Sequence, residues 1–88
     1  MSLRPHRDRI DAGRDHRTAA VEHLRSSAPD DPLQAVAFWR AVLDLADDAI
    51  VEAVERCRRE ELTWAVIGLA YDRAASTTFA KFAKLIGE

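Results

Sequence analysis

Nine consecutive residues give the clearest structural signal in the chain: Thr63-Trp64-Ala65-Val66-Ile67-Gly68-Leu69-Ala70-Tyr71. A threonine hydroxyl can accept a hydrogen bond from a backbone amide in the first turn of a helix, so Thr63 is expected to cap a helix from Trp64 to Tyr71. Trp64 and Ile67 lie three residues apart, which puts both on one buried side of this helix. Gly68 stands in its middle, where glycine costs about 1 kcal/mol relative to alanine. A glycine at this position indicates a packing constraint on the helix.

The residues that follow indicate a tight break and a second short helix. The break is Asp72-Arg73-Ala74. A last helix is expected to run to about Ile86, because apolar residues recur at spacings of three and four along one side of it: Phe79, Phe82, Ala83 and Ile86. Its opposite side carries Thr77, Lys81 and Lys84. Residues 63–86 are therefore expected to form two short helices.

A longer helix is expected upstream, from Asp31-Pro32 to about Arg59. Aspartate caps free amides, and proline at the first helical position loses nothing by lacking its own. An apolar stripe follows this helix at seven-residue intervals, flanked by Trp39: Val36, Leu43, Ile50 and Cys57. The helix that carries the stripe is about 40 Å long at 1.5 Å per residue. It serves either the core alone or the core together with a subunit interface, and Cys57 is expected to be a buried, inert thiol.

The segment from Thr63 to Gly68 resembles the start of the helix-turn-helix in small bacterial and phage DNA-binding proteins. In that family a Ser or Thr cap precedes Trp-Ala-x-Ile-Gly, then a turn and a recognition helix. The resemblance covers about residues 31–86 and implies a DNA-binding regulator, usually a homodimer, in which Gly68 lies bare where the second helix crosses. Its turn usually holds Gly, an apolar residue and Ser, whereas this chain has Asp72, Arg73 and Ala74. A turn one residue longer is therefore expected, with Ala74 filling the core and Phe79 buried.

The resemblance also implies roles for polar residues. In the recognition helix, expected over residues 75–86, base edges would be read by Ser76, Thr77 and Lys81. Phosphates would be held by Arg58, Arg59, Thr63, Arg73 and Lys84. None of the base readers is an Arg or Asn that makes bidentate contacts, so one copy is expected to bind double-stranded DNA weakly, and a dimer would read two half-sites.

The N-terminal third carries little apolar patterning. Residues 1–29 hold six Arg against four acids, and residues 30–61 hold four Arg against nine acids. Residues 1–14 are expected to be a flexible basic arm, which is either an ordinary tail or a tracker of the phosphate backbone. A short helix over residues 15–26 is expected to open a single all-α domain of about four helices, residues 15–88.

Composition restricts the class of function. The chain has 88 residues, 48% of them apolar and 32% charged, with a net charge of −2. We find no catalytic constellation, no metal-ligand spacing around its three His, no cofactor motif and no membrane span, so a cytoplasmic, non-enzymatic protein without cofactor or metal is expected. The alternative to DNA binding is a helical protein-interaction domain with a degenerate helix-turn-helix.

Overall fold

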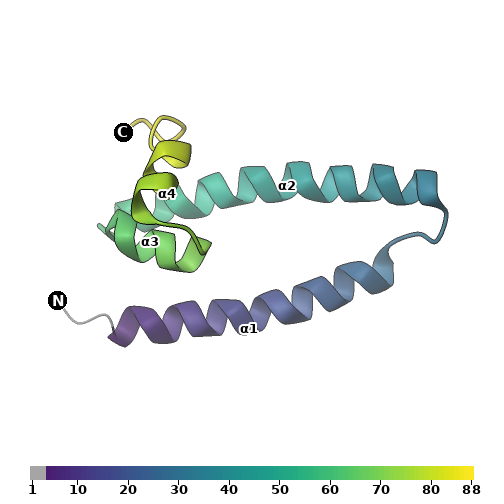
Figure 1. Ribbon diagram of the computed structural model, residues 1–88, viewed down its shortest axis with the longest axis horizontal. Coiled ribbons are helices and arrows are strands. Elements are labelled where there is room, and N and C mark those ends of the chain that lie inside the picture. Colours follow the sequence, from purple (N-terminus) through teal and green to yellow (C-terminus); the bar gives the residue numbers. More distant parts are fainter. Residues whose placement is uncertain (1–3) are drawn as a thin grey trace. The chain divides into compact units, whose positions relative to one another are not determined.

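The part of the chain that the structure describes contains four helices, and Figure 1 colours the chain in sequence order. The computed structural model describes the backbone of residues 4–88 and the side chains of residues 6–88. The helices are α1 (Arg4–Ser27), α2 (Pro32–Arg59), α3 (Trp64–Tyr71) and α4 (Ala75–Phe82). No strand occurs among the described residues. The expected all-α class with about four helices is confirmed.

Helix α1 begins much earlier than expected. Residues 4–14, expected to belong to a flexible arm, are helical and continuous with the rest of α1, while residues 1–3 of that arm lie outside the described part. Arg and Ala favour helix, and the alternating charges fall at helical spacing, as in the Arg14–Asp11 ion pair of 3.7 Å. The same Arg-Asp alternation that keeps the net charge of this segment small therefore supports a helix.

Helix α2 starts as expected and ends in a left-handed turn. Asp31 Oδ2 accepts a hydrogen bond of 3.0 Å from the Gln34 amide, next to Pro32 at the first helical position. At the other end, Glu61 has a φ of 63°, and the Leu62 amide donates to the Cys57 carbonyl at 3.1 Å. This is the Schellman pattern, which reverses the chain at once and directs it into α3.

The chain separates into two compact units, Met1–Ala46 and Asp47–Glu88. The boundary falls within α2. The second unit holds the core, in which Val54, Ile67 and Phe82 are buried and packed by half-buried neighbours: Ile50, Val51, Cys57, Leu62, Trp64, Tyr71 and Ile86. Its three helical elements are the C-terminal part of α2, α3 and α4, which lie next to one another in Figure 1.

The apolar stripe of α2 has two environments. Its C-terminal members, Ile50 and Cys57, pack against the core of the second unit. Its N-terminal members remain accessible: Val36 is 68% exposed, Leu43 50% and Trp39 39%. The stripe therefore contributes to the core only from Ile50 onward.

Candidate functional site

The cap of α3 forms as the sequence predicts. Thr63 has extended backbone angles, and its Oγ1 accepts a hydrogen bond of 3.2 Å from the Val66 amide. The turn that it starts buries three consecutive residues, Val66, Ile67 and Gly68. Thr63 thus orients α3 on the core, and its side chain remains at the surface of the protein.

Gly68 is the point at which α3 meets the start of α4. A Cβ atom at this position would lie 2.7 Å from the Arg73 carbonyl oxygen and 3.3 Å from both the Ala75 nitrogen and Thr78 Oγ1. The Gly68 carbonyl also accepts a hydrogen bond of 3.0 Å from the Arg73 amide. The packing constraint expected of this glycine is therefore confirmed, because the backbone of the turn occupies the space of a side chain.

The turn between α3 and α4 is shorter than expected. Asp72 takes the left-handed conformation, with φ 65° and ψ 35°, and α4 begins at Ala75 directly after Ala74. Aspartate tolerates this conformation better than most residues, so it can stand where the resembled family uses glycine. Ala74 is exposed and does not fill the core.

Consequently the buried face of α4 differs in part from the expected one: Phe82 and Ala83 are buried as expected, but Thr78 is buried in place of Phe79. Thr78 and Phe82 are 0% and 1% exposed, whereas Phe79, which was expected in the core, is 49% exposed. Residues four apart share a helix face, so a start at Ala75 directs Thr78 and Phe82 together toward the core. Thr78 is satisfied there because its Oγ1 donates to the Ala74 carbonyl at 2.9 Å. Phe79 contacts Trp64 edge-on instead, with ring centroids 5.5 Å apart.

Helix α4 also ends earlier than expected, at Phe82 instead of near Ile86. Turns follow over residues 83–87, held by hydrogen bonds such as that from the Ile86 amide to the Phe82 carbonyl at 3.2 Å. Gly87 has a φ of 84°, which a residue with a side chain rarely adopts. These turns bring Glu88 back to the end of α2.

Two of the three expected base-reading residues are exposed on the first turn of α4. They are Ser76 and Thr77, which precede the buried Thr78. The third, Lys81, is exposed but directed at α3: its Nζ donates to the Tyr71 hydroxyl at 2.8 Å and lies 5.5 Å from the centre of that ring. The hydrogen bond to Tyr71 favours the charged ammonium and raises the pKa of Lys81.

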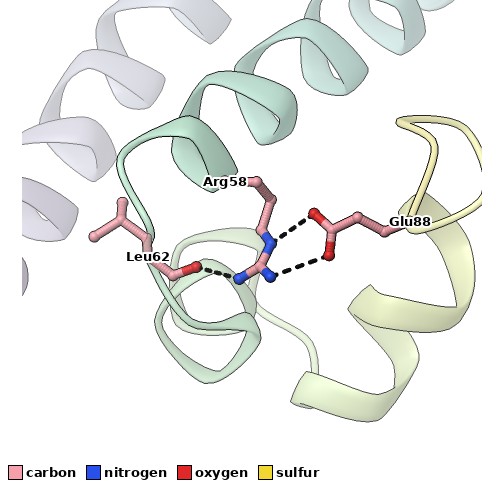
Figure 2. A network of polar contacts seen from close by, with 3 residues as sticks. All are labelled: Arg58, Leu62 and Glu88. Atoms are coloured by element: carbon pink, nitrogen blue, oxygen red, sulfur yellow. Dashed lines mark hydrogen bonds and ion pairs between the residues drawn. The ribbon is translucent and has the colours of Figure 1, made fainter.

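Arg58 has a structural role that the sequence did not reveal. Figure 2 shows its guanidinium between Glu88 and the Leu62 carbonyl. Nε and Nη2 donate to the Glu88 carboxylate at 2.8 and 3.0 Å, Nη1 donates to the Leu62 carbonyl at 2.6 Å, and the guanidinium carbon lies 5.0 Å from the centre of the Trp64 ring. The hydrogen bond from Arg58 lowers the pKa of Glu88. The expected phosphate contact of Arg58 is not supported, since its donors already bind groups of the chain.

The other expected phosphate-binding cations are exposed. Arg59 pairs with Glu55 at 2.8 Å across one helical turn, and Arg73 Nη1 donates to the Asp72 carbonyl at 2.8 Å. Lys84 is exposed after the end of α4. An exposed ion pair of this kind contributes little stability, so the Arg59 guanidinium can exchange its partner at small cost.

A hollow of about 360 Å³ lies between α2 and the end of α4. Its wall is mainly apolar and contains Ile50, Val51, Phe82 and Leu85, with Asp47, Asp48 and Lys81 also lining it. Only the placement of α4 reveals that apolar residues adjoin the carboxylates of Asp47 and Asp48.

No group of three or more His, Cys, Asp or Glu among the described residues is placed to hold a metal ion. The described helices include none that is long and apolar enough to cross a membrane. Comparison of the chain with protein-family models, with characterised proteins and with solved structures found no match.

Proposed function

We propose that the chain is a non-enzymatic, cytoplasmic transcriptional regulator or phage or plasmid control protein that binds double-stranded DNA through α3 and α4. The observation that carries the proposal is the crossing at Gly68, where backbone 2.7 Å from a would-be Cβ leaves no room for a side chain. A three-residue turn then leaves the first turn of α4 exposed, and this is the part of a recognition helix that meets base edges.

The exposed residues suggest how the protein would read DNA. The hydroxyls of Ser76 and Thr77 can donate to or accept from base edges, and the Thr77 methyl can contact a thymine methyl. Lys81 would have to exchange its Tyr71 hydroxyl for a guanine. Phosphates would be bound by Arg59, Arg73 and Lys84, with Thr63 at the start of α3. Few contacts and a negative net charge predict weak binding by one copy, and a homodimer on two half-sites would compensate for this.

A binding experiment on the full chain tests the proposal. Fluorescence anisotropy is measured with a pool of random double-stranded DNA at about 50 and 200 mM salt, between which phosphate-dependent binding falls steeply. The variant is Thr77→Glu, which places a negative charge on the exposed turn of α4. The control is Gln34→Glu, which adds the same charge at an exposed position of α2.

We expect salt-dependent binding by the wild type and the control, and a loss of at least tenfold in affinity for Thr77→Glu. Selection from the pool would then yield the preferred sequence. Absence of binding at the lower salt concentration, or equal loss in both variants, would refute recognition through α4.

A second candidate, a protein-interaction domain, is favoured by the hollow beside α4. Asp47 and Asp48 line this hollow next to apolar side chains, and the Asp47 carboxylate also attracts the Lys81 ammonium. An apolar side chain next to a basic one on a partner protein would fit this combination. A wild-type chain that is folded but binds no DNA would favour such a protein partner.

A further inference from the structure

The N-terminal part of α2 presents an apolar row that the first unit leaves uncovered. Val36, Trp39 and Leu43 lie within about 60° of one another around the helix, at spacings of three and four residues. They are 68%, 39% and 50% exposed. Monomeric proteins rarely expose neighbouring large apolar side chains, so such a row indicates an interaction surface.

We propose that this row, residues Val36, Trp39, Leu43 and Ala46, pairs with the same row of a second copy in antiparallel orientation. The inference deepens the proposed function, because it rests on the homodimer proposed above and identifies its interface. A second copy is the expected partner, because apolar residues at spacings of three and four form the seam along which two identical helices pack in a coiled coil.

The core of the second unit limits the length of the interface. Ile50 and Cys57 continue the same stripe but already pack against Val54, Ile67 and Phe82. A coiled coil over the whole stripe would have to remove them from that core. Only about three helical turns, residues 36–46, therefore remain for a second copy.

Side-chain size favours the antiparallel orientation. When the two helices run antiparallel, Trp39 of each copy lies opposite Leu43 of the other, and Val36 lies opposite Ala46. Each large side chain then meets a smaller one, and the two-fold axis repeats the contact. A parallel pair in register would place two Trp39 side chains in one layer, which crowds that layer and leaves the Ala46 layer underfilled.

Charges beside the row do not select an orientation. Arg40 and Asp44 lie next to the row and form an exposed ion pair of 3.3 Å within one copy. Antiparallel pairing brings the same flank of both helices together, so each Arg40 comes close to the other Arg40 as well as to Asp44 of either copy, and the pairing with Asp44 offsets this like-charge contact. Three turns bury less than the roughly 800 Å² per partner of a stable interface, so we expect a dissociation constant on the order of 10 μM.

Sedimentation equilibrium from about 1 to 300 μM tests the interface with two variants of the full chain. Leu43→Asp places a carboxylate in the row. Leu45→Asp is the matched control, because Leu45 is even more exposed, at 71%, but lies about 200° around the helix from Leu43. Circular dichroism confirms that both variants keep their helix content.

We expect the wild type and Leu45→Asp to dimerise over this range, and Leu43→Asp to weaken dimerisation at least tenfold. A wild type that stays monomeric at 300 μM would overturn the inference. Equal weakening by both variants would overturn it as well, since it would show that the row is not the interface.

Crosslinking tests the orientation. In a Cys57→Ser background, Val36→Cys and Ala46→Cys are prepared separately, oxidised alone and oxidised as a mixture. Antiparallel pairing brings position 36 of one copy to position 46 of the other and leaves like positions about 15 Å apart along the axis. The mixture should therefore form a disulfide that neither variant forms alone, and crosslinking of each variant with itself would overturn the orientation.

The two proposals fail in different ways. If the protein dimerises through Leu43 but binds no DNA, the interface is supported and the proposed function is refuted. If it binds DNA as a monomer, and Leu43→Asp binds with equal affinity, DNA binding is supported and the interface is refuted.

Discussion

Substitution of Gly68 by alanine tests the geometry on which the proposed function depends. The new Cβ would lie 2.7 Å from the Arg73 carbonyl oxygen, where ordinary contacts begin at 3.4 Å. Both this oxygen and the Ala75 nitrogen at 3.3 Å belong to the backbone of the turn, so no side chain can rotate away to relieve the contact. Helix α4 and the turn would have to move away from α3 together.

Two opposing effects set the magnitude. Alanine stabilises a helix by about 1 kcal/mol relative to glycine. Overpacking in a well-packed site costs about 1–3 kcal/mol, and a contact with backbone belongs at the upper end of this range. We therefore expect Gly68→Ala to lower the free energy of unfolding by about 2 kcal/mol, which corresponds to a decrease in Tm of about 8–16 °C for a domain of this size.

Gly13 provides the matched control. It lies inside α1, and a Cβ there would meet nothing within 4 Å. Gly13→Ala should therefore show the helix gain alone, a stabilisation of about 0.5–1 kcal/mol.

Thermal unfolding of the full chain measures both variants. Circular dichroism follows all helices, and tryptophan fluorescence in a Trp39→Phe background follows Trp64 and hence the second unit. If Gly68→Ala is as stable as the wild type, or is stabilised like Gly13→Ala, the close approach of α4 to α3 does not restrict this position, and the support for a helix-turn-helix falls with it.

Three further substitutions test the supports of the same unit. Hydrogen bonding by Arg58 lowers the pKa of Glu88, so this contact stabilises the fold above the ordinary glutamate pKa and is lost as the pH falls through the lowered value. Glu88→Gln should therefore lower Tm at pH 7, and in a pH series of thermal melts the difference from the wild type should shrink as the pH falls below the ordinary glutamate pKa of about 4.3 and disappear once the pH is below the lowered pKa; a constant difference down to pH 2 would contradict this reasoning. Asp72→Ala should lose about 1 kcal/mol in urea unfolding relative to Asp72→Gly, because both variants lose the same side chain but alanine tolerates the left-handed conformation poorly, and equal stability of the two variants would argue against strain at this φ of 65°. Thr63→Ala should cost about 1 kcal/mol because the Val66 amide loses its acceptor, while Thr63→Ser should retain most of the stability, and a neutral Thr63→Ala would show that water replaces the cap.

The functional interpretation depends on which cations remain accessible. Arg58 binds Glu88 and Leu62, and Lys81 binds Tyr71, so two of the expected DNA contacts already have partners in the second unit. The exposed hydroxyls of Ser76 and Thr77 carry most of the proposed base reading. Substitutions at these two positions should therefore affect recognition more than substitutions at Arg58, which should act through stability.

Local signals were sufficient for the starts of α2 and α3. Thr63 caps α3 because a hydroxyl can reach an amide of the first turn, and Asp31 and Pro32 start α2 for the corresponding reason. Gly68 indicated a close approach because glycine inside a helix costs free energy unless packing requires it. The two cap interactions span three residues each, and the contacts at Gly68 reach no farther than Thr78, so the nearby residues contain the information.

The register of α4 required the three-dimensional arrangement. The spacing of Phe79, Phe82 and Ala83 is compatible with a buried face, yet Thr78 is buried and Phe79 is half-exposed. The reason is that the backbone of the turn fits over Gly68 only when Asp72 adopts a left-handed conformation and α4 begins at Ala75. The length of the turn decides whether Thr78 or Phe79 completes the buried face beside Phe82 and Ala83, and composition carries no signal for this difference.

Periodicity predicts that α2 has one apolar stripe, but it cannot assign the partner of each part of that stripe. Ile50 and Cys57 pack on α3 and α4, whereas Val36 and Leu43 stay exposed, because the two short helices cover only the C-terminal turns of α2. The pairing of Arg58 with Glu88 joins residues 30 positions apart in the chain. Such contacts depend on where the chain returns in space, so helix and cap formation can be read locally, whereas burial, register and long-range pairing follow only from packing.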